Sequence, residues 1–213
     1  MNISFRNVMP TPLASIEHGA DSIWGHPIEL KKGERILLNA SSGKGKSTFT
    51  STSIGLRKDY AGQILYDGKD IKEYQPADWT QLRQRHLSVV FQDLQLFPDL
   101  SVAENLQLKN GLTGTFSDEE LQERLSKMGI GEKWNQKCGL LSMGQQQRVA
   151  ILRALSQPFD WLIMDEPFSH LDTANADICL NMIHERCFEQ GAGFVLTSLG
   201  ETHGYEYSRE LKL

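Results

Sequence analysis

The sequence has few of the features that mark several large classes of protein. It has an odd number of cysteines, Cys138, Cys179 and Cys187, and their spacing is not that of metal ligands, so we expect free thiols. No apolar run of about 18 residues is present, and the N-terminus lacks the charged start and apolar stretch of a signal peptide. A net charge of −5 gives no general electrostatic case for nucleic acid, and we expect no such partner. We therefore expect a cytoplasmic chain that meets a membrane only through a partner.

The sequence does contain enough apolar residues for one core. Hydrophobic residues make up 39% of the 213 positions, and we expect a single α/β domain over residues 1–213. From about residue 92 to about residue 150 the character becomes helical, which predicts a helical subdomain inserted between two parts of the core, residues 1–91 and 151–213. Short apolar runs in the core predict strands at Ile3–Val8, Arg35–Asn39, Leu87–Phe91, Trp161–Met164 and Gly193–Thr197.

Turn and capping signals predict the other elements. A D-G turn within Gln63–Ile71, between apolar flanks, predicts a hairpin and therefore an antiparallel fringe beside the core. The pairs Ser101 with Glu104 and Ser117 with Glu120 fit the S-x-x-E capping box, in which each side chain satisfies a free backbone donor at a helix start. Further helices are expected at Ser47–Gly55 and Ala77–His86.

The segment Ala40–Thr48, A-S-S-G-K-G-K-S-T, fits the phosphate-loop pattern G-x-x-x-x-G-K-[ST] except that Ala40 replaces its first glycine. Backbone N–H groups can converge on phosphate oxygens only if side chains stay clear, and glycine gives that clearance. Lys46 would neutralise the β- and γ-phosphates of ATP, and the Ser47 hydroxyl would ligate Mg²⁺. The residues expected to bind nucleotide in this loop are Ser42, Gly43, Lys44, Gly45, Lys46, Ser47 and Thr48.

An acidic pair ends the apolar run W-L-I-M at Trp161–Met164. Asp165 would lie at the carboxyl edge of this strand and face the hydration shell of Mg²⁺, whereas Glu166 projects differently and could polarise the attacking water. Acidic residues often end strands for solubility alone, but the combination with a phosphate loop favours a catalytic site. Gln92, directly after another predicted strand, would reach the metal and the water. The predicted catalytic residues are Glu166, Gln92 and Lys46, and the predicted metal ligands are Ser47, Gln92 and Asp165.

A further motif, L-S-M-G-Q-Q-Q-R, occupies Leu141–Arg148. Together with the motifs above, this motif resembles those of the ATP-binding subunits of ABC (ATP-binding cassette) transporters, and the resemblance covers nearly the whole chain. Within that family the motif sequences are similar to those of the lipoprotein-releasing, macrolide-export and cell-division group. The resemblance implies a P-loop NTPase core, ATP and Mg²⁺ as cofactors, and a head-to-tail dimer with a second ABC ATPase subunit. It also implies that Ser142, Gly144 and Gln145 bind the ATP held by the opposite subunit, and that Ser169–Asp172 links the two sites.

Several positions depart from the family pattern. Met143 stands where glycine is usual, which works against close approach to phosphate. Ser198 stands where the family has its switch histidine, so we expect slow hydrolysis. His203 is expected to be an exposed loop histidine, with a substitute role as the alternative. The aromatic residue that usually stacks on adenine is missing from Met9–Ser15, and Trp24 lies nearby although its register suggests the following strand.

The segment Gln92–Leu106 looks like the part of the family that grips a cytoplasmic helix of a membrane permease. The resemblance therefore implies a subunit that dimerises around two MgATP and hydrolyses ATP to drive an integral membrane permease, and that is held at the inner face of the cell membrane by that partner. Two alternatives stay open. One is an ATP-gated structural or regulatory switch with little turnover, which Ser198 and Met143 favour; the other is the ATPase of a soluble assembly complex. The retained Glu166 favours hydrolysis.

Overall fold

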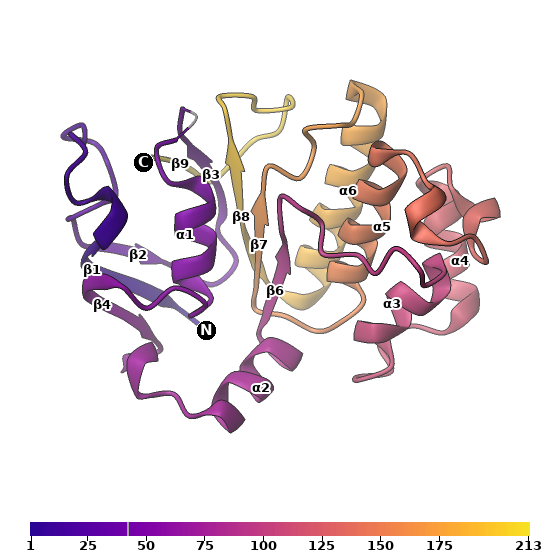
Figure 1. Cartoon of the computed structure of the whole chain (residues 1–213), viewed down its shortest axis with the longest axis horizontal. Helices are drawn as coiled ribbons and strands as arrows, with labels where there is room; N and C mark the ends of the chain where they lie inside the picture. The colour runs from indigo at the N-terminus through magenta and orange to yellow at the C-terminus, as the bar shows by residue number, and fades with distance from the viewer. Residues whose placement is uncertain (42) are drawn as a thin grey trace.

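Two β-sheets, with helices between and beside them, make up the molecule (Figure 1). The structure, a computed structural model, describes residues 1–41 and 43–213. One sheet is antiparallel with strand order β2-β1-β4-β5, and the turn Asp67-Gly68 joins β4 to β5 as the D-G signal predicts. Its strands are β1 (Ile3–Pro10), β2 (Ile28–Leu30), β4 (Tyr60–Tyr66) and β5 (Lys69–Asp70).

The other sheet is parallel, with strand order β6-β7-β8-β3-β9. Its central strands are buried on both faces, which explains why their sequences are continuous apolar runs without alternation. Parallel pairing brings the carboxyl ends of β3, β7 and β8 to one edge, where Asp165 pairs with Thr197 and Asn39 with Ser198. The strands are β3 (Arg35–Asn39), β6 (Leu87–Val90), β7 (Trp161–Asp165), β8 (Gly193–Ser198) and β9 (Arg209–Lys212).

Helix α1 (Lys46–Ser53) lies between the two sheets (Figure 1). Phe49 on this helix is 1% exposed, and its ring stacks on Phe5 of β1 with a centroid distance of 5.6 Å. The same apolar cluster includes Ile36 and Leu38 of β3. Because α1 begins at the end of the phosphate loop, this packing fixes the loop against the carboxyl edge of the parallel sheet.

The remaining helices cover the other face of the parallel sheet, except for α2 (Pro76–Arg85), which precedes β6 (Figure 1). Three of them come between β6 and β7 in sequence: α3 (Val102–Asn110), α4 (Asp118–Lys127) and α5 (Met143–Leu155). Helix α6 (Thr173–Gln190) follows β7. The predicted boundaries of the helical subdomain at residues 92 and 150 stay a prediction. Short 3-10 turns occupy Thr11–Leu13, Ile71–Glu73, Gly131–Lys133 and Cys138–Leu140.

The capping prediction is confirmed at both sites. Ser101 accepts a hydrogen bond from the Glu104 N–H at 3.2 Å, and Ser117 accepts one from the Glu120 N–H at 3.2 Å. In return, each glutamate carboxylate accepts a hydrogen bond from the N–H of its serine. Trp24 is a correction, because it lies in a turn rather than in the strand that follows it. Its indole is 2% exposed and packs against Phe49, so burial rather than strand pairing explains its place.

The other sequence-based expectations about the chain as a whole concern its thiols and its membrane character. All three cysteines are free and buried, and burial raises the pKa of the Cys138 thiol to about 11. Within residues 1–41 and 43–213, none of the helices combines the length and the apolar character needed to cross a bilayer.

Candidate active site

The phosphate loop runs from the end of β3 into α1. Gly43 and Gly45 have left-handed backbone, with φ of +77° and +104°, a conformation that glycine adopts without the penalty of a Cβ. A Cβ on Gly45 would lie 2.6 Å from Leu13 Cδ1, whereas one on Gly43 would meet nothing within 4 Å. Gly45 is therefore required by its left-handed backbone, with Leu13 leaving little room beside it, whereas Gly43 borders open space. Ser42, which the sequence predicts to bind nucleotide, lies outside the described residues.

Lys46 is the most enclosed of the predicted nucleotide-binding residues that the structure describes, with a side chain that is 6% exposed. Its ammonium Nζ donates to the Ala40 and Ser41 carbonyl oxygens at 3.0 and 3.3 Å and lies 3.2 Å from Glu166 Oε1. Ala40 thus contributes its backbone carbonyl oxygen. An alanine supplies this group as well as the glycine of the usual pattern would. The lysine charge is held at the centre of the loop, where phosphate oxygens could exchange for the carboxylate.

The other predicted loop residues are placed differently. Lys44 Nζ lies 3.4 Å from the Glu17 carbonyl oxygen, which turns its charge toward the surface segment after β1. Ser47 and Thr48 lie in the first turn of α1, whose backbone N–H groups have no partner within the helix. That free turn is suited to an anion, since the helix dipole adds partial positive charge there.

A group of oxygen-bearing side chains lies beside the loop. The Ser47 hydroxyl donates to Gln92 Oε1 at 3.3 Å, which joins α1 to the segment after β6. Asp165, at the end of β7, is 3% exposed, and its Oδ1 accepts a hydrogen bond from Thr197 Oγ1 at 2.9 Å. Hydroxyl, amide and carboxylate oxygens are the donors that Mg²⁺ accepts when phosphates supply the rest of its shell.

The described residues include no cluster of three His, Cys, Asp or Glu side chains that could hold a metal ion alone.

Glu166 has a left-handed backbone, with φ of +47°, which is unusual for a residue that carries a Cβ. Its N–H donates to Thr197 Oγ1 at 3.1 Å, and its carbonyl accepts from Gln147 Nε2 at 3.3 Å. The resulting position points the carboxylate at Lys46. Strained residues of this kind gather at active sites, where the surroundings hold them. Sequence patterns do not predict the hydrogen bond from Gln147 to Glu166. The contact of Thr197 with Glu166, in contrast, follows from the pairing of β7 with β8.

A cavity of about 280 Å³ opens beside Glu166 and is lined in part by Thr197, Ser198 and His203. The expectation of an exposed His203 is wrong: its side chain is 15% exposed, and its ring packs edge-on against Phe168 with a centroid distance of 4.9 Å. His203 is also in the left-handed region, with φ of +51°. An aromatic partner in a folded loop explains the difference, and no local pattern in the sequence predicts it.

Ser198 does not point a free hydroxyl into this cavity. Its Oγ accepts from the N–H groups of Gly200 and Glu201 at 3.2 and 2.9 Å and lies 2.9 Å from the Glu201 carbonyl oxygen. The serine therefore closes the turn that leads to His203. The hydroxyl is occupied by the backbone of its own loop.

The motif at Leu141–Arg148 forms the start of α5. Ser142 is the N-cap and forms a capping box with Gln145, and a separate cavity of about 470 Å³ is lined by Ser142, Met143 and Gly144. Met143 is 47% exposed, so its side chain faces solvent at the helix start. No loop residue from 43 to 48 lines this cavity, and among the described residues no hydrogen bond joins the loop to Ser142, Gly144 or Gln145.

The region expected to meet the base has no aromatic plane on its surface. Met9–Ser15 forms the end of β1 and a 3-10 turn, and Leu13 packs on the phosphate loop at Gly45. Trp24 is too deeply buried to stack on a ligand, and its Nε1 has no hydrogen-bond partner among the described residues. Among the described residues, the groups placed to bind a nucleotide are therefore those around its phosphates.

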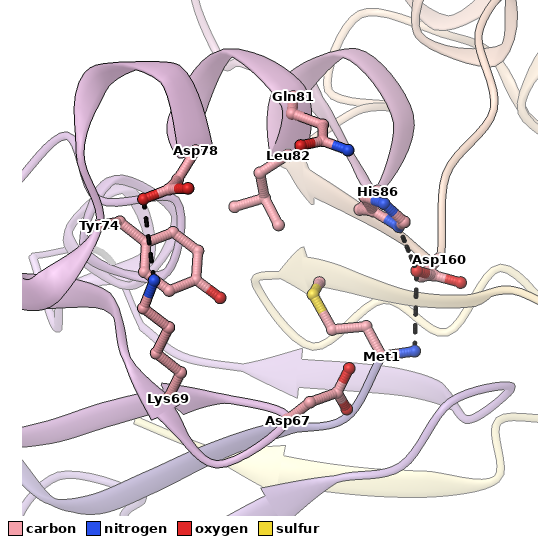
Figure 2. A pocket seen from close by; sticks show the side chains of 9 residues that line it. All are labelled: Met1, Asp67, Lys69, Tyr74, Asp78, Gln81, Leu82, His86 and Asp160. Atoms are coloured by element: carbon pink, nitrogen blue, oxygen red, sulfur yellow. Dashed lines mark hydrogen bonds and ion pairs between the residues drawn. The ribbon is translucent and has the colours of Figure 1, made fainter.

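Figure 2 shows another cavity, of about 280 Å³, beside the start of β7. Asp160 lies there with Oδ2 2.7 Å from His86 Nδ1 and Oδ1 2.7 Å from Lys32 Nζ. Lys69 lies 3.7 Å from Asp78. Asp160 and Asp78 of this cavity lie beside cations, whereas Asp67 accepts a hydrogen bond from the Asn2 N–H at 2.7 Å. Asp160 lies at the opposite end of β7 from Asp165. We assign no reaction to it.

Comparisons with known proteins agree with these features. A family model described as ABC transporter matches residues 26–169. The lipoprotein-releasing system ATP-binding protein LolD of Novosphingobium aromaticivorans is 31% identical over 196 residues, which cover 91% of this chain and 88% of that protein. The macrolide export ATP-binding/permease protein MacB of Syntrophobacter fumaroxidans is 33% identical over 179 residues, which cover 82% of this chain. The match spans 25% of the length of MacB.

Solved structures give the same result. The dimeric structure of MJ0796, a bacterial ABC transporter cassette, matches with a TM-score of 0.83 and 27% identity, covering 99% of this chain and 94% of the other. A dimeric post-hydrolysis state of the same cassette, bound to ADP and Pi, matches with a TM-score of 0.81, 27% identity and the same coverage of 99% and 94%. The fold is that of a cassette which binds nucleotide.

Proposed function

This chain belongs to the ABC transporter family, and on that premise we propose that it is an ATPase subunit which pairs with a second cassette around two MgATP and drives a separate membrane permease. One observation carries the proposal: a buried lysine, a strained glutamate and a serine–glutamine pair converge at one edge of the parallel sheet. The ATP-binding name of the relatives and the ADP-bound state of the similar cassette support the choice of substrate.

Phosphate binding would proceed by exchange. The γ-phosphate would take the place that the Glu166 carboxylate holds at Lys46 Nζ, 3.2 Å away. The free N–H groups at the start of α1 would bind the β- and γ-phosphates, with Gly43 and Lys44 at the open side of the loop. Binding thereby releases Glu166 from its ion pair and frees its carboxylate for a water molecule.

Hydrolysis would then depend on charges that are already in place. Glu166 would orient and polarise the attacking water, and Gln92 would hold that water from the opposite side. Ser47, Gln92 and Asp165 supply oxygen atoms for Mg²⁺, and the bound ion would neutralise charge that develops on the phosphates. Thr197 orients Asp165 by donating a hydrogen bond from its hydroxyl to Oδ1, 2.9 Å away.

The surface around Met143 would complete the site of the partner subunit. Ser142, Gly144 and Gln145 lie at the start of α5, where the capping box occupies the N–H groups of Ser142 and Gln145 and the Gly144 N–H has no partner within the helix. Among the described residues no hydrogen bond joins them to residues 43–48 of their own chain, and their cavity contains none of those residues. The dimeric state of the similar cassette supports this pairing.

A third surface would receive the permease. A cavity of about 260 Å³ is lined by apolar side chains, including Leu56 and Phe91, and by Arg83, Lys109 and Arg153. None of these three cations forms an ion pair within the described part of the chain, and burial together with Arg153 and Arg83 lowers the pKa of Lys109. We expect an apolar helix that carries an acidic residue to dock here, because it would supply the missing negative charge.

The segment after Phe91 connects this cavity with the nucleotide site. Gln92 contacts Ser47, and the next residues, Leu94 and Gln95, have left-handed backbone with φ of +58° and +50°. Arg153 Nη2 and Nη1 hold their carbonyl oxygens, each at 2.7 Å. A permease helix in the cavity would therefore touch the segment that also reaches the metal.

The test is to isolate the chain with the membrane protein that accompanies it and to measure MgATP hydrolysis and ATP-dependent dimerisation by light scattering. We expect hydrolysis by the wild type, dimers of Glu166→Gln in ATP, and monomers of Lys46→Ala. Lys109→Glu should weaken the membrane complex without changing nucleotide binding. Dimerisation without hydrolysis would establish the ATP-gated switch instead, and the absence of both would refute the proposal.

A further inference from the structure

Glu166 keeps a backbone conformation that a residue with a Cβ adopts only when its surroundings hold it there. Both sides of its backbone are held. The N–H donates to Thr197 Oγ1 at 3.1 Å, and the carbonyl oxygen accepts from Gln147 Nε2 at 3.3 Å and from the Ser169 N–H at 3.4 Å. Only the bond from Gln147 comes from a helix outside the loop and the neighbouring strand.

Gln147 directs its whole amide at the loop that carries Glu166. It is 1% exposed on α5, and its Nε2 also donates to Ser169 Oγ at 3.2 Å while its Oε1 accepts from the His170 N–H at 3.0 Å. A buried amide that satisfies donor and acceptor at once specifies a single arrangement, because each partner would otherwise be left without a hydrogen bond. This glutamine of the Q-Q-Q run therefore faces inward and binds no nucleotide.

The same loop touches α5 one turn earlier. A Cβ on Gly144 would lie 2.8 Å from the His170 carbonyl oxygen, so only glycine allows this approach. Gly144 and Gln147 are three residues apart and share one face of the helix. The start of α5 and the loop at residues 166–170 are therefore fastened at two neighbouring points.

We infer that Gln147 is a positioning residue that holds Glu166 in its active conformation and makes the Ser142 segment and the Glu166 loop move as one body. The inference rests on the proposed function, in which Ser142 serves the ATP of one site and Glu166 the ATP of the other. Because one subunit contributes to both sites, this contact would transmit the occupancy of one ATP site to the carboxylate of the other.

The experiment measures MgATP hydrolysis against ATP concentration for the membrane complex containing wild-type chain, Gln147→Met or Gln147→Glu. Methionine keeps the length of the side chain without its polar atoms. Glutamate keeps the acceptor for the His170 N–H and removes the amide donor to Glu166. For both variants we expect kcat to fall about tenfold or more through misplacement of Glu166, half-saturation by ATP to stay within about twofold, and the Hill coefficient to approach about 1.

Gln157 gives a matched control. It is also 1% exposed, and its Nε2 donates to the Arg83 and Leu87 carbonyl oxygens at 3.0 and 2.9 Å, away from the nucleotide site. Gln157→Met should lower the melting temperature while kcat and the Hill coefficient stay at wild-type values. Wild-type kcat and cooperativity in both Gln147 variants would overturn the inference, as would equal losses in Gln147→Met and Gln157→Met. A wild-type chain without hydrolysis would instead refute the proposed function, which separates the two failures.

Discussion

The phosphate-loop side and the α5 side of the molecule differ in how far each is complete within one chain. Around the phosphate loop the charged side chains of Lys46 and Asp165 are buried, with exposures of 6% and 3%, and each contacts a polar neighbour of the same chain. At the start of α5 the side chains face outward, and Leu140 and Met143 are 72% and 47% exposed. The first side can form before any ligand arrives. The second leaves apolar surface and free N–H groups for a partner, which is how a site shared by two copies is built.

The strongest test of this difference is Glu166→Gln. Loss of the residue that polarises water should lower kcat by about 10²–10⁴-fold. The substitution also removes the carboxylate that competes for Lys46 Nζ, so ATP affinity should rise rather than fall. Hydrolysis and binding of labelled ATP are measured on the same preparation, with Lys46→Ala as the control that loses binding. Weaker ATP binding by Glu166→Gln would show that the ion pair does not oppose phosphate entry.

Met143→Asp tests the outward-facing side. A carboxylate opposite the phosphates of the partner's ATP should weaken ATP-dependent dimerisation by about tenfold or more, since facing like charges cost several kcal/mol. The same change places an acidic residue in the first turn of α5, where the helix dipole should raise the free energy of unfolding by about 0.3–1 kcal/mol. Analytical ultracentrifugation should show the weaker dimerisation, and urea unfolding should show the higher free energy of unfolding. Unchanged dimerisation would show that the segment around Met143 is not part of the dimer interface.

His203→Ala tests whether a second side chain on the phosphate-loop side, besides Glu166, contributes to hydrolysis. His203 lines the cavity beside Glu166, so its removal should lower kcat severalfold with little change in ATP affinity. His184→Ala is the matched control, because its Nδ1 lies 2.6 Å from the Tyr205 hydroxyl outside this cavity. If His203→Ala retains wild-type kcat, the imidazole serves only to pack against Phe168.

The smallest effect on hydrolysis is expected far from both sides, at Asp160, where the expected change is one of stability. Partial burial opposes its ionisation, but hydrogen bonds from Lys32 and His86 outweigh burial and lower the pKa of Asp160. A lowered pKa in the folded state contributes stability above the ordinary value of about 3.9, and this stability is lost as the pH falls through the folded pKa. Asp160→Asn should therefore cost about 1–3 kcal/mol near neutral pH and progressively less in acid. Urea unfolding at several pH values checks this, and a cost independent of pH would contradict it.

Sequence patterns predict the strands and helix starts because these depend on local signals. The capping residues Ser101 and Ser117 and the apolar run of β7 are examples, and the order of the motifs predicts the family. The placement of Trp24 and His203 is not predictable in this way, because each packs against an aromatic ring far along the chain. The left-handed backbone of Glu166 depends likewise on contacts from β8 and α5. The assignment of the nucleotide and metal ligands stays a prediction.

Helix α5 has a mechanical consequence for the whole assembly. It has 13 residues, which gives a rod about 20 Å long. Met143 stands exposed at one end, and Arg153 near the other grips the carbonyl oxygens of Leu94 and Gln95. A stiff rod that pivots at its buried middle moves its two ends in opposite directions, so a tilt of about 10° shifts each end by about 1.7 Å. In the proposed function, such a rod would convert closure at the nucleotide into displacement at the surface expected to meet the permease.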